Sequence, residues 1–171
     1  VAWYSLTANA ELSGSHRYTW EGDGTEFMEA TGSYALIEGG GGYVLVAASG
    51  STRPLGDDID DVEGLLADGS VIETAWSSGE GGSRDTLNVI KDGARTQLDS
   101  ISGGWFEVRA GAMSVVYTRE SSHDRSQTCV WSAATGRSCT AASDESDDVV
   151  LATDTGFLSD ESHPRWTPIS S

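Results

Sequence analysis

A spacing of 43 residues between glycines in matching surroundings restricts the folds open to this chain more than any other feature. Gly50, Gly93 and Gly136 each stand between two short runs of alternating apolar and polar residues, in YVLVAASGSTRPL, LNVIKDGARTQL and CVWSAATGRSCT. Such runs predict strands, and the central glycine predicts the tight turn of a hairpin. Asn9, in AWYSLTANAEL, stands 41 residues before Gly50, and asparagine also tolerates the positive φ of these turns.

A second hairpin pattern precedes each of the three glycine hairpins. It reads as strand, turn and strand in EFMEATGSYALIE (26–38), VEGLLADGSVIETAW (62–76) and WFEVRAGAMSVVYTR (105–119). A fourth copy, DVVLATDTGFLS (148–159), is predicted to turn at Gly156, as the others turn at Gly32, Gly69 and Gly111. The chain therefore predicts units of four strands, over residues 26–56, 62–99 and 104–142.

Four strands in a repeat of about 43 residues are typical of a β-propeller blade. The hairpins near the two ends, in residues 1–14 and 147–171, would together make one further blade. We therefore expect a single all-β domain over residues 1–171, propeller-like, with about four repeats closed by pairing of the termini. A β-sandwich or part of a larger propeller is the alternative, because residues 165–169 fit an additional strand.

The phrases LADGSVIETAW and LNVIKDGARTQL resemble TolB-like and WD40-like propeller repeats, in which a strand after a turn glycine is followed by a hairpin containing DG. The resemblance covers residues 26–143, but the Trp-Asp and Gly-His dipeptides common in such repeats are absent. It implies a fold and a habit of binding rather than an activity.

The charge balance limits the partners of the chain. Acidic residues number 27 against ten basic ones, which gives a net charge of −17. Phosphate backbones are repelled by such a surface, so we expect no nucleic-acid binding. No run of 18 apolar residues occurs, and we expect no membrane insertion. Salt adaptation, cation binding or a basic partner would each fit the acidity.

The two cysteines are predicted to form a disulfide. Cys129 and Cys139 flank a predicted turn at residues 134–136, and paired strands would place the two side chains nearly opposite each other. Two buried free thiols are the alternative. A disulfide implies an oxidising compartment, and the chain starts at Val1 without a signal segment, so we expect an extracellular or cell-surface protein.

The predicted blade geometry gathers the long connections at one end. In a blade, the first–second and third–fourth turns lie at one end, whereas the longer loops, here including 77–85 and 99–105, lie at the other and commonly carry binding residues. Trp3, Trp131 and Trp105 fall within strands, where core or inter-blade packing is expected, although Trp105 also lies near the loop face. Exposed aromatic rings cover the apolar faces of sugars. We therefore expect the loop face to bind a glycan or protein partner through Tyr18, Trp20, Trp76 and Trp166.

Acidic runs in the same loops are candidate calcium ligands. Calcium requires several converging carboxylate and carbonyl oxygens. Such oxygens are offered by Asp57, Asp58, Asp60 and Asp61, or by Asp144, Glu145, Asp147 and Asp148. Neither run has the EF-hand spacing, so a solvated acidic loop is the alternative, and no other cofactor is expected.

No pattern in the chain identifies a catalytic residue. A glycoside hydrolase would need a pair of carboxylates, but the acids are too numerous for the sequence to single one out. The motifs G-x-S-x-G, H-E-x-x-H and C-x-x-C are absent. A binding module is therefore expected rather than an enzyme, and a self-assembling extracellular component is the alternative.

Overall fold

The computed structural model consists of antiparallel β-strands over the residues that it describes: 2–6, 12–17, 26–39, 42–56, 58–79, 82–121, 125–140, 149–159 and 164–168. These ranges contain no helix, so the expected all-β class is confirmed. None of the described residues form a helix that would cross a membrane. The chain divides into two compact units, Val1–Ile59 with Ala67–Gly69, and Asp60–Leu66 with Ser70–Ser171.

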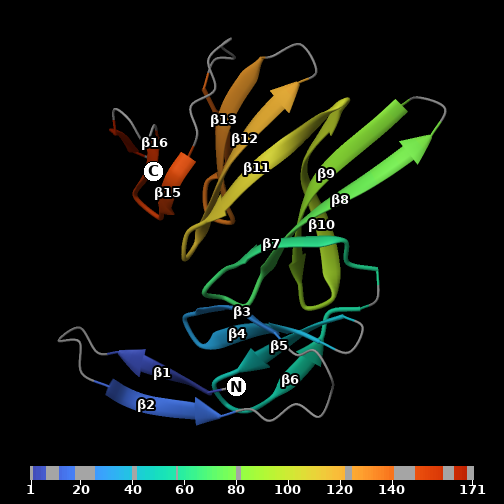
Figure 1. The fold of residues 1–171 in the computed structure, drawn as a ribbon. Helices are drawn as coiled ribbons and strands as arrows, with labels where there is room; N and C mark the ends of the chain where they lie inside the picture. Colours follow the sequence, from blue (N-terminus) through green and yellow to red (C-terminus); the bar gives the residue numbers. More distant parts are fainter. Residues whose placement is uncertain are drawn as a thin grey trace. The chain divides into compact units, whose positions relative to one another are not determined.

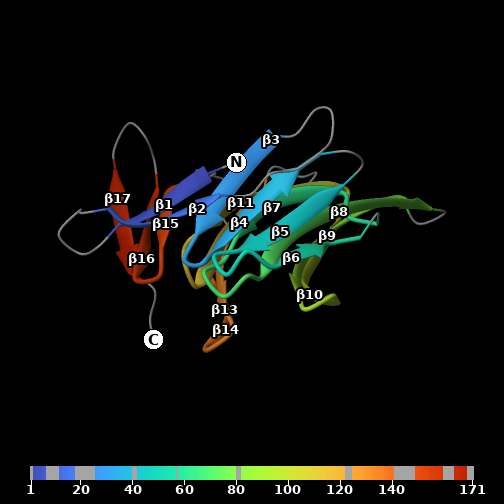
Figure 2. The same cartoon turned by 90° about the horizontal axis from the view of Figure 1, so that it is seen from below.

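The first unit contains two sheets. One pairs β1 (Ala2–Leu6) with β2 (Leu12–Arg17). The other is a meander of β3 (Glu26–Thr31), β4 (Tyr34–Glu38), β5 (Tyr43–Ala47) and β6 (Thr52–Pro54), shown in Figures 1 and 2. The apolar centres of β4 and β5 pair directly, Ile37 with Val44 and Ala35 with Val46, and all four side chains are buried. This continuous apolar pairing holds the meander together.

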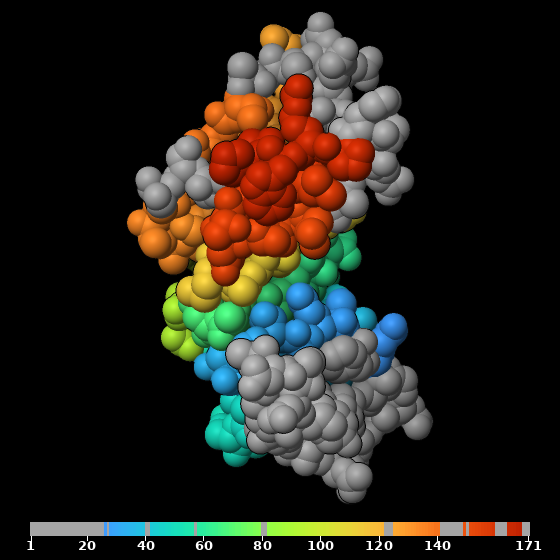
Figure 3. All heavy atoms as spheres, turned by 90° about the vertical axis from the view of Figure 1, so that its left-hand side faces the viewer, coloured from blue at the N-terminus to red at the C-terminus, as the bar shows by residue number. Residues whose placement is uncertain are grey.

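The second unit contains three sheets. The first is β7 (Asp61–Leu65), β8 (Val71–Gly79), β9 (Gly82–Lys91) and β10 (Ala94–Ser102). The second is β11 (Gly104–Ala110), β12 (Ser114–Ser121), β13 (Ser126–Ser132) and β14 (Gly136–Cys139). The third, whose surface faces the viewer in Figure 3, is β15 (Val149–Thr153), β16 (Gly156–Ser159) and β17 (Arg165–Pro168).

Sheet β11–β14 packs against a sheet on each of its faces. Tyr117 lies on one face, in a core with Phe106 and with Ile72 and Leu87 of sheet β7–β10. Its ring meets that of Phe106 edge to face, with centroids 5.8 Å apart. The adjacent residue Val116 points to the opposite face and packs with residues of sheet β15–β17. Strand alternation therefore gives β12 two buried faces.

The three glycines that define the repeat occupy equivalent places. Gly50, Gly93 and Gly136 each lie where the third strand of a four-stranded sheet joins the fourth, with φ of +87°, +81° and +72°. A β-carbon at any of them would meet no atom within 4 Å, so the left-handed backbone rather than crowding requires glycine there. The predicted four-strand units are thus the observed meanders β3–β6, β7–β10 and β11–β14.

The ends of the chain differ from the expected extra blade. Among the described strands, β1 and β2 pair only with each other, and the tail pairs as β17 with β16. β17 is therefore the third strand of the sheet β15–β17. The expected pairing of the termini is not seen in these sheets, and the closed ring stays a prediction.

Two predicted loops of the second unit are largely strand. Residues 77–79 continue β8 and residues 82–85 belong to β9, with Ser77 paired with Arg84, and residues 99–102 continue β10. The end of β8 is exposed on both faces, since Trp76–Gly79 are all exposed. After Trp76 it therefore carries only serine and glycine. Without a buried face, the alternation that marks a strand is lost.

Candidate functional site

Two exposed tryptophans lie at one end of the second unit. We call this the connection end, where β8 joins β9, β10 joins β11 and β12 joins β13 (Figure 1). Trp76, near the end of β8, is 62% exposed, and Trp105, at the start of β11, is 54% exposed. At this exposure both indole rings are accessible to a ligand, which makes them candidate binding residues.

Each of these tryptophans is paired across its sheet with an acidic residue. Trp76 lies directly opposite Asp85, and Trp105 directly opposite Glu120. Directly opposed residues of antiparallel strands project from the same face with their β-carbons about 5 Å apart. Each pair therefore presents an indole ring and a carboxylate side by side.

Further polar contacts hold the strand that carries Trp76. The Trp76 amide donates to Asp60 Oδ2 at 3.3 Å, and the Thr74 hydroxyl donates to Glu63 Oε1 at 2.6 Å. Burial raises the pKa of the Asp85 carboxyl. The ring of Trp76 is thus exposed on a strand whose backbone is fixed by its neighbours.

Glu73 anchors β8 three residues before Trp76. Its side chain is fully buried, and its carboxylate accepts hydrogen bonds from Arg95 at 2.9 Å, from the Asn88 amide at 3.0 Å and from the Asp60 backbone N–H at 3.3 Å. These partners lie on β10, on β9 and before β7. A buried carboxylate with three donors fixes the register of the sheet.

A second buried carboxylate, Asp99, joins sheets β7–β10 and β11–β14. It accepts the Tyr117 hydroxyl at 3.1 Å and pairs with Arg137 at 2.9 Å and with Arg119 Nε at 3.3 Å. Burial, reinforced by the Asp99 charge, raises the pKa of Tyr117 well above its usual range. Because Tyr117 is completely buried, this cluster is a structural link between sheets rather than a site open to a substrate.

The structure describes two of the four predicted aromatic binding residues. Trp76 is at the connection end, whereas Trp166 lies in β17 opposite Leu158, 48% exposed and resting against Gly156. Tyr18 and Trp20 lie outside the described residues.

One tryptophan of the candidate site was assigned to packing by the sequence reasoning. Trp105 was placed near the loop face but was expected to pack in the core or between blades, and its exposure shows that this packing prediction was wrong. The preceding Gly103-Gly104 was the available signal that β11 begins there and that its first residues lie beyond the core. Trp131, in contrast, packs against the core as expected, and the side chain of Trp3 is not described.

The predicted calcium ligands are described in part. Asp58, Asp60 and Asp61 are in the structure, and Asp57 lies outside the described residues. Within the described ranges, no three His, Cys, Asp or Glu side chains are grouped to hold a metal ion. Asp60 instead accepts the Trp76 amide, and calcium binding by this run stays a prediction.

The predicted disulfide is present. Cys129 of β13 and Cys139 of β14 are directly opposed in the sheet, with their α-carbons 4.0 Å apart, and their sulfurs are bonded. Both cysteines of the chain are used in this bond. The disulfide ties the exposed edge strand β14 to the buried strand β13.

Comparisons with known protein families, curated proteins and solved structures found no match for this chain. We therefore base the proposed function on the chemistry of the connection end.

Proposed function

We propose that this chain is an extracellular binding module that recognises a glycan at the connection end of its second unit. The observation that carries the proposal is the pair formed by Trp76, 62% exposed, and Asp85 directly opposite it. An indole ring covers the apolar C–H face of a sugar, and a neighbouring carboxylate accepts hydrogen bonds from its hydroxyls. Trp105 and Glu120 repeat the arrangement on the next sheet.

The disulfide supports the extracellular location, because such bonds persist in oxidising compartments. A propeller-like ring is the arrangement we propose for the four repeats, with β1–β2 and β15–β17 at its closure. Spin labels on β2 and β16 would test the ring. A single narrow distance distribution is expected, and a broad one would contradict closure.

A glycan array with matched tryptophan variants tests the binding function. Trp76→Ala and Trp105→Ala should each weaken binding of a retained glycan by about tenfold, since each removes one ring contact of about 1–1.5 kcal/mol. Trp166→Ala is the control, because Trp166 is similarly exposed but lies opposite Leu158 rather than an acid. Equal losses in all three variants, or no glycan retained by the wild type, would refute the proposal.

The same assay separates the alternative functions. Release of reducing sugar from a bound glycan would indicate a glycoside hydrolase. Self-assembly would appear in light scattering as a mass above that of one chain. Low salt makes this test stringent, because the net charge of −17 is then least screened and opposes association of like chains.

A further inference from the structure

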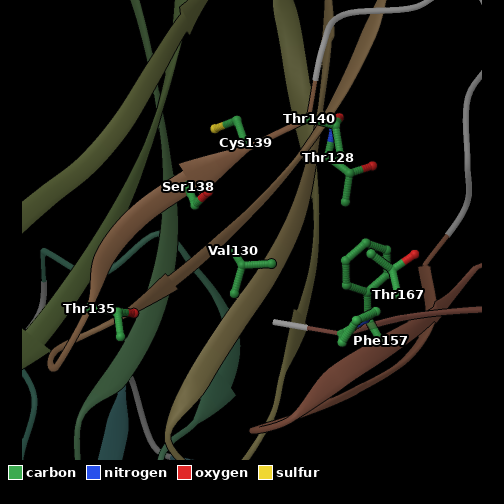
Figure 4. Close-up of a pocket in the computed structure, with 9 residues that line it drawn as sticks. Thr128, Val130, Thr135, Ser138, Cys139, Thr140, Phe157 and Thr167 are labelled. Carbon is green, nitrogen blue, oxygen red and sulfur yellow. The ribbon is translucent and has the colours of Figure 1, made fainter. Parts of the chain in front are cut away.

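Two hollows of the second unit share Thr135 in their linings, and we call the two together the groove beside β14. Figure 4 shows the residues of the first hollow. The first hollow, about 210 Å³, lies between sheet β11–β14 and sheet β15–β17. Its floor contains Val130 and Phe157, and hydroxyl groups surround it, from Thr128, Ser138, Thr140 and Thr167. This lining suits a small side chain with a polar end.

The second hollow, about 520 Å³, has an apolar floor and one acidic group. Met113, Ala133 and Ala134 supply the apolar surface of this hollow. Among the described residues that line it, Asp154 is the charged one. Asp154 Oδ1 accepts the Met113 amide and the Ser114 hydroxyl, which fixes the carboxylate at the rim. A lysine or arginine side chain fits this second hollow, because its apolar stem can lie on the apolar surface while its cationic head meets the Asp154 carboxylate.

The backbone of β14 presents hydrogen-bonding groups along this groove. Among the described strands, β14 lies at the edge of its sheet, and all four of its residues are exposed. The Thr140 amide bonds to the Thr128 carbonyl at 2.9 Å, so residues 140 and 138 direct their backbone groups toward β13. By alternation, Arg137 and Cys139 direct theirs outward, in the spacing that an added antiparallel or parallel strand uses.

We propose that this groove binds an extended, basic segment of a partner protein. The segment adds as a strand to β14 and places a lysine or arginine beside Asp154 and a small side chain in the hydroxyl-lined hollow. Side chains on one face of such a strand are about 6.6 Å apart, and a segment of about four to six residues covers the four residues of β14. The chain's net charge of −17 favours a basic partner and opposes a second copy of itself.

The site is separate from the proposed glycan site. None of its residues belongs to the two tryptophan–carboxylate pairs, and it lies beside the β13–β14 turn rather than at the connection end. Failure of one proposal therefore leaves the other standing.

Fluorescence anisotropy of the full chain with three labelled heptapeptides tests the inference. The first is Val-Thr-Val-Lys-Val-Thr-Val, which places threonine and lysine on the same face of the strand, the second has glutamate in place of lysine, and the third is the lysine peptide with alternate backbone nitrogens methylated. The lysine peptide should bind at least tenfold more tightly than either of the others. Asp154→Asn, which keeps the acceptor oxygen for Met113, should weaken binding of the lysine peptide threefold to fivefold, in line with an exposed ion pair.

Asp92→Asn is the matched control, because Asp92 is an exposed turn residue whose positive φ asparagine tolerates. It removes the same charge and should leave the affinity unchanged. Equal weakening by both variants would show that only net charge matters and would overturn the site. Equal binding of the lysine and glutamate peptides, of the methylated and unmethylated peptides, or no binding at millimolar concentration would also overturn the proposal.

Discussion

Two glutamate–arginine pairs of the second unit have the same length but very different burial, and they allow a sharp test of the role of Glu73. Glu73 and Arg95 are 2.9 Å apart, as are Glu107 and Arg109. The Glu73 side chain is fully buried, whereas that of Glu107 is 30% exposed. Burial, rather than distance, should therefore separate the effects of removing each glutamate.

Glu73→Ala removes the acceptor of three donors inside the sheet. The Asn88 amide loses its partner at 3.0 Å, Arg95 loses its anion, and the Asp60 amide loses its acceptor. Arg95 is itself 38% exposed and can be solvated, but the buried Asn88 amide is left without its carboxylate acceptor, which costs about 1–3 kcal/mol. Glu107→Ala removes an exposed pair worth about 0–1 kcal/mol. The free energy of unfolding should thus fall by about 1–2 kcal/mol more in Glu73→Ala.

Urea unfolding followed by tryptophan fluorescence measures this difference, and hydrogen exchange of the β8–β10 amides locates it in the second unit. If Glu73→Ala does not fold, Glu73→Gln keeps one acceptor oxygen and should lie between the wild type and Glu73→Ala in stability. Equal losses in Glu73→Ala and Glu107→Ala would refute the reasoning, because burial would then have no role.

Three other outcomes follow from the described contacts. Tyr117, whose pKa is raised by burial, should stay protonated in the folded chain where exposed tyrosines ionise. Because the unfolded chain then releases this proton, stability should fall as pH rises above about 10. A titration followed by absorbance at 295 nm should show Tyr117 ionising only on unfolding. Reducing the disulfide should lower stability by about 2–3 kcal/mol for so short a loop. It should also speed hydrogen exchange of the Thr140 amide, which bonds to the Thr128 carbonyl, before that of the β13 amides, which mass spectrometry of fragments will show. Because the pKa of Asp85 is raised in the folded chain, stability should fall as pH rises from the ordinary aspartate pKa through this raised value, and thermal melts of Asp85→Asn should lack that fall.

The repeat and the hairpin registers were predictable because their causes are local. A turn needs a residue with positive φ, and the chain supplies Asp92-Gly93 with φ of +52° and +81° between two arms that alternate in polarity. The same argument placed Cys129 opposite Cys139, since residues equally distant from a tight turn must face each other. Neither inference required knowledge of distant contacts.

The buried carboxylates were not predictable for the opposite reason. Glu73 and Asp99 are two of 27 acidic residues, and their partners stand up to 38 positions away in the sequence, as with Asp99 and Arg137. Gly111 and Gly156 also matched the turn pattern, yet neither has the positive φ of the other turn glycines among the described residues. Gly156 is required by the ring of Trp166 that packs on it, a contact formed between strands rather than within a turn.

The position of Trp105 beside Phe106 explains how an exposed tryptophan is compatible with a stable sheet. Phe106 points into the core between two sheets and is 9% exposed, while its neighbour Trp105 points to the other face and is 54% exposed. Because adjacent residues of a strand have opposite directions, the core contacts that order β11 also hold the backbone of Trp105. Anchoring by Phe106 lowers the entropic cost of ordering the indole when a ligand binds. The same relation connects buried Glu73 to Trp76 along β8, so both tryptophans stand on strands fixed by burial close by.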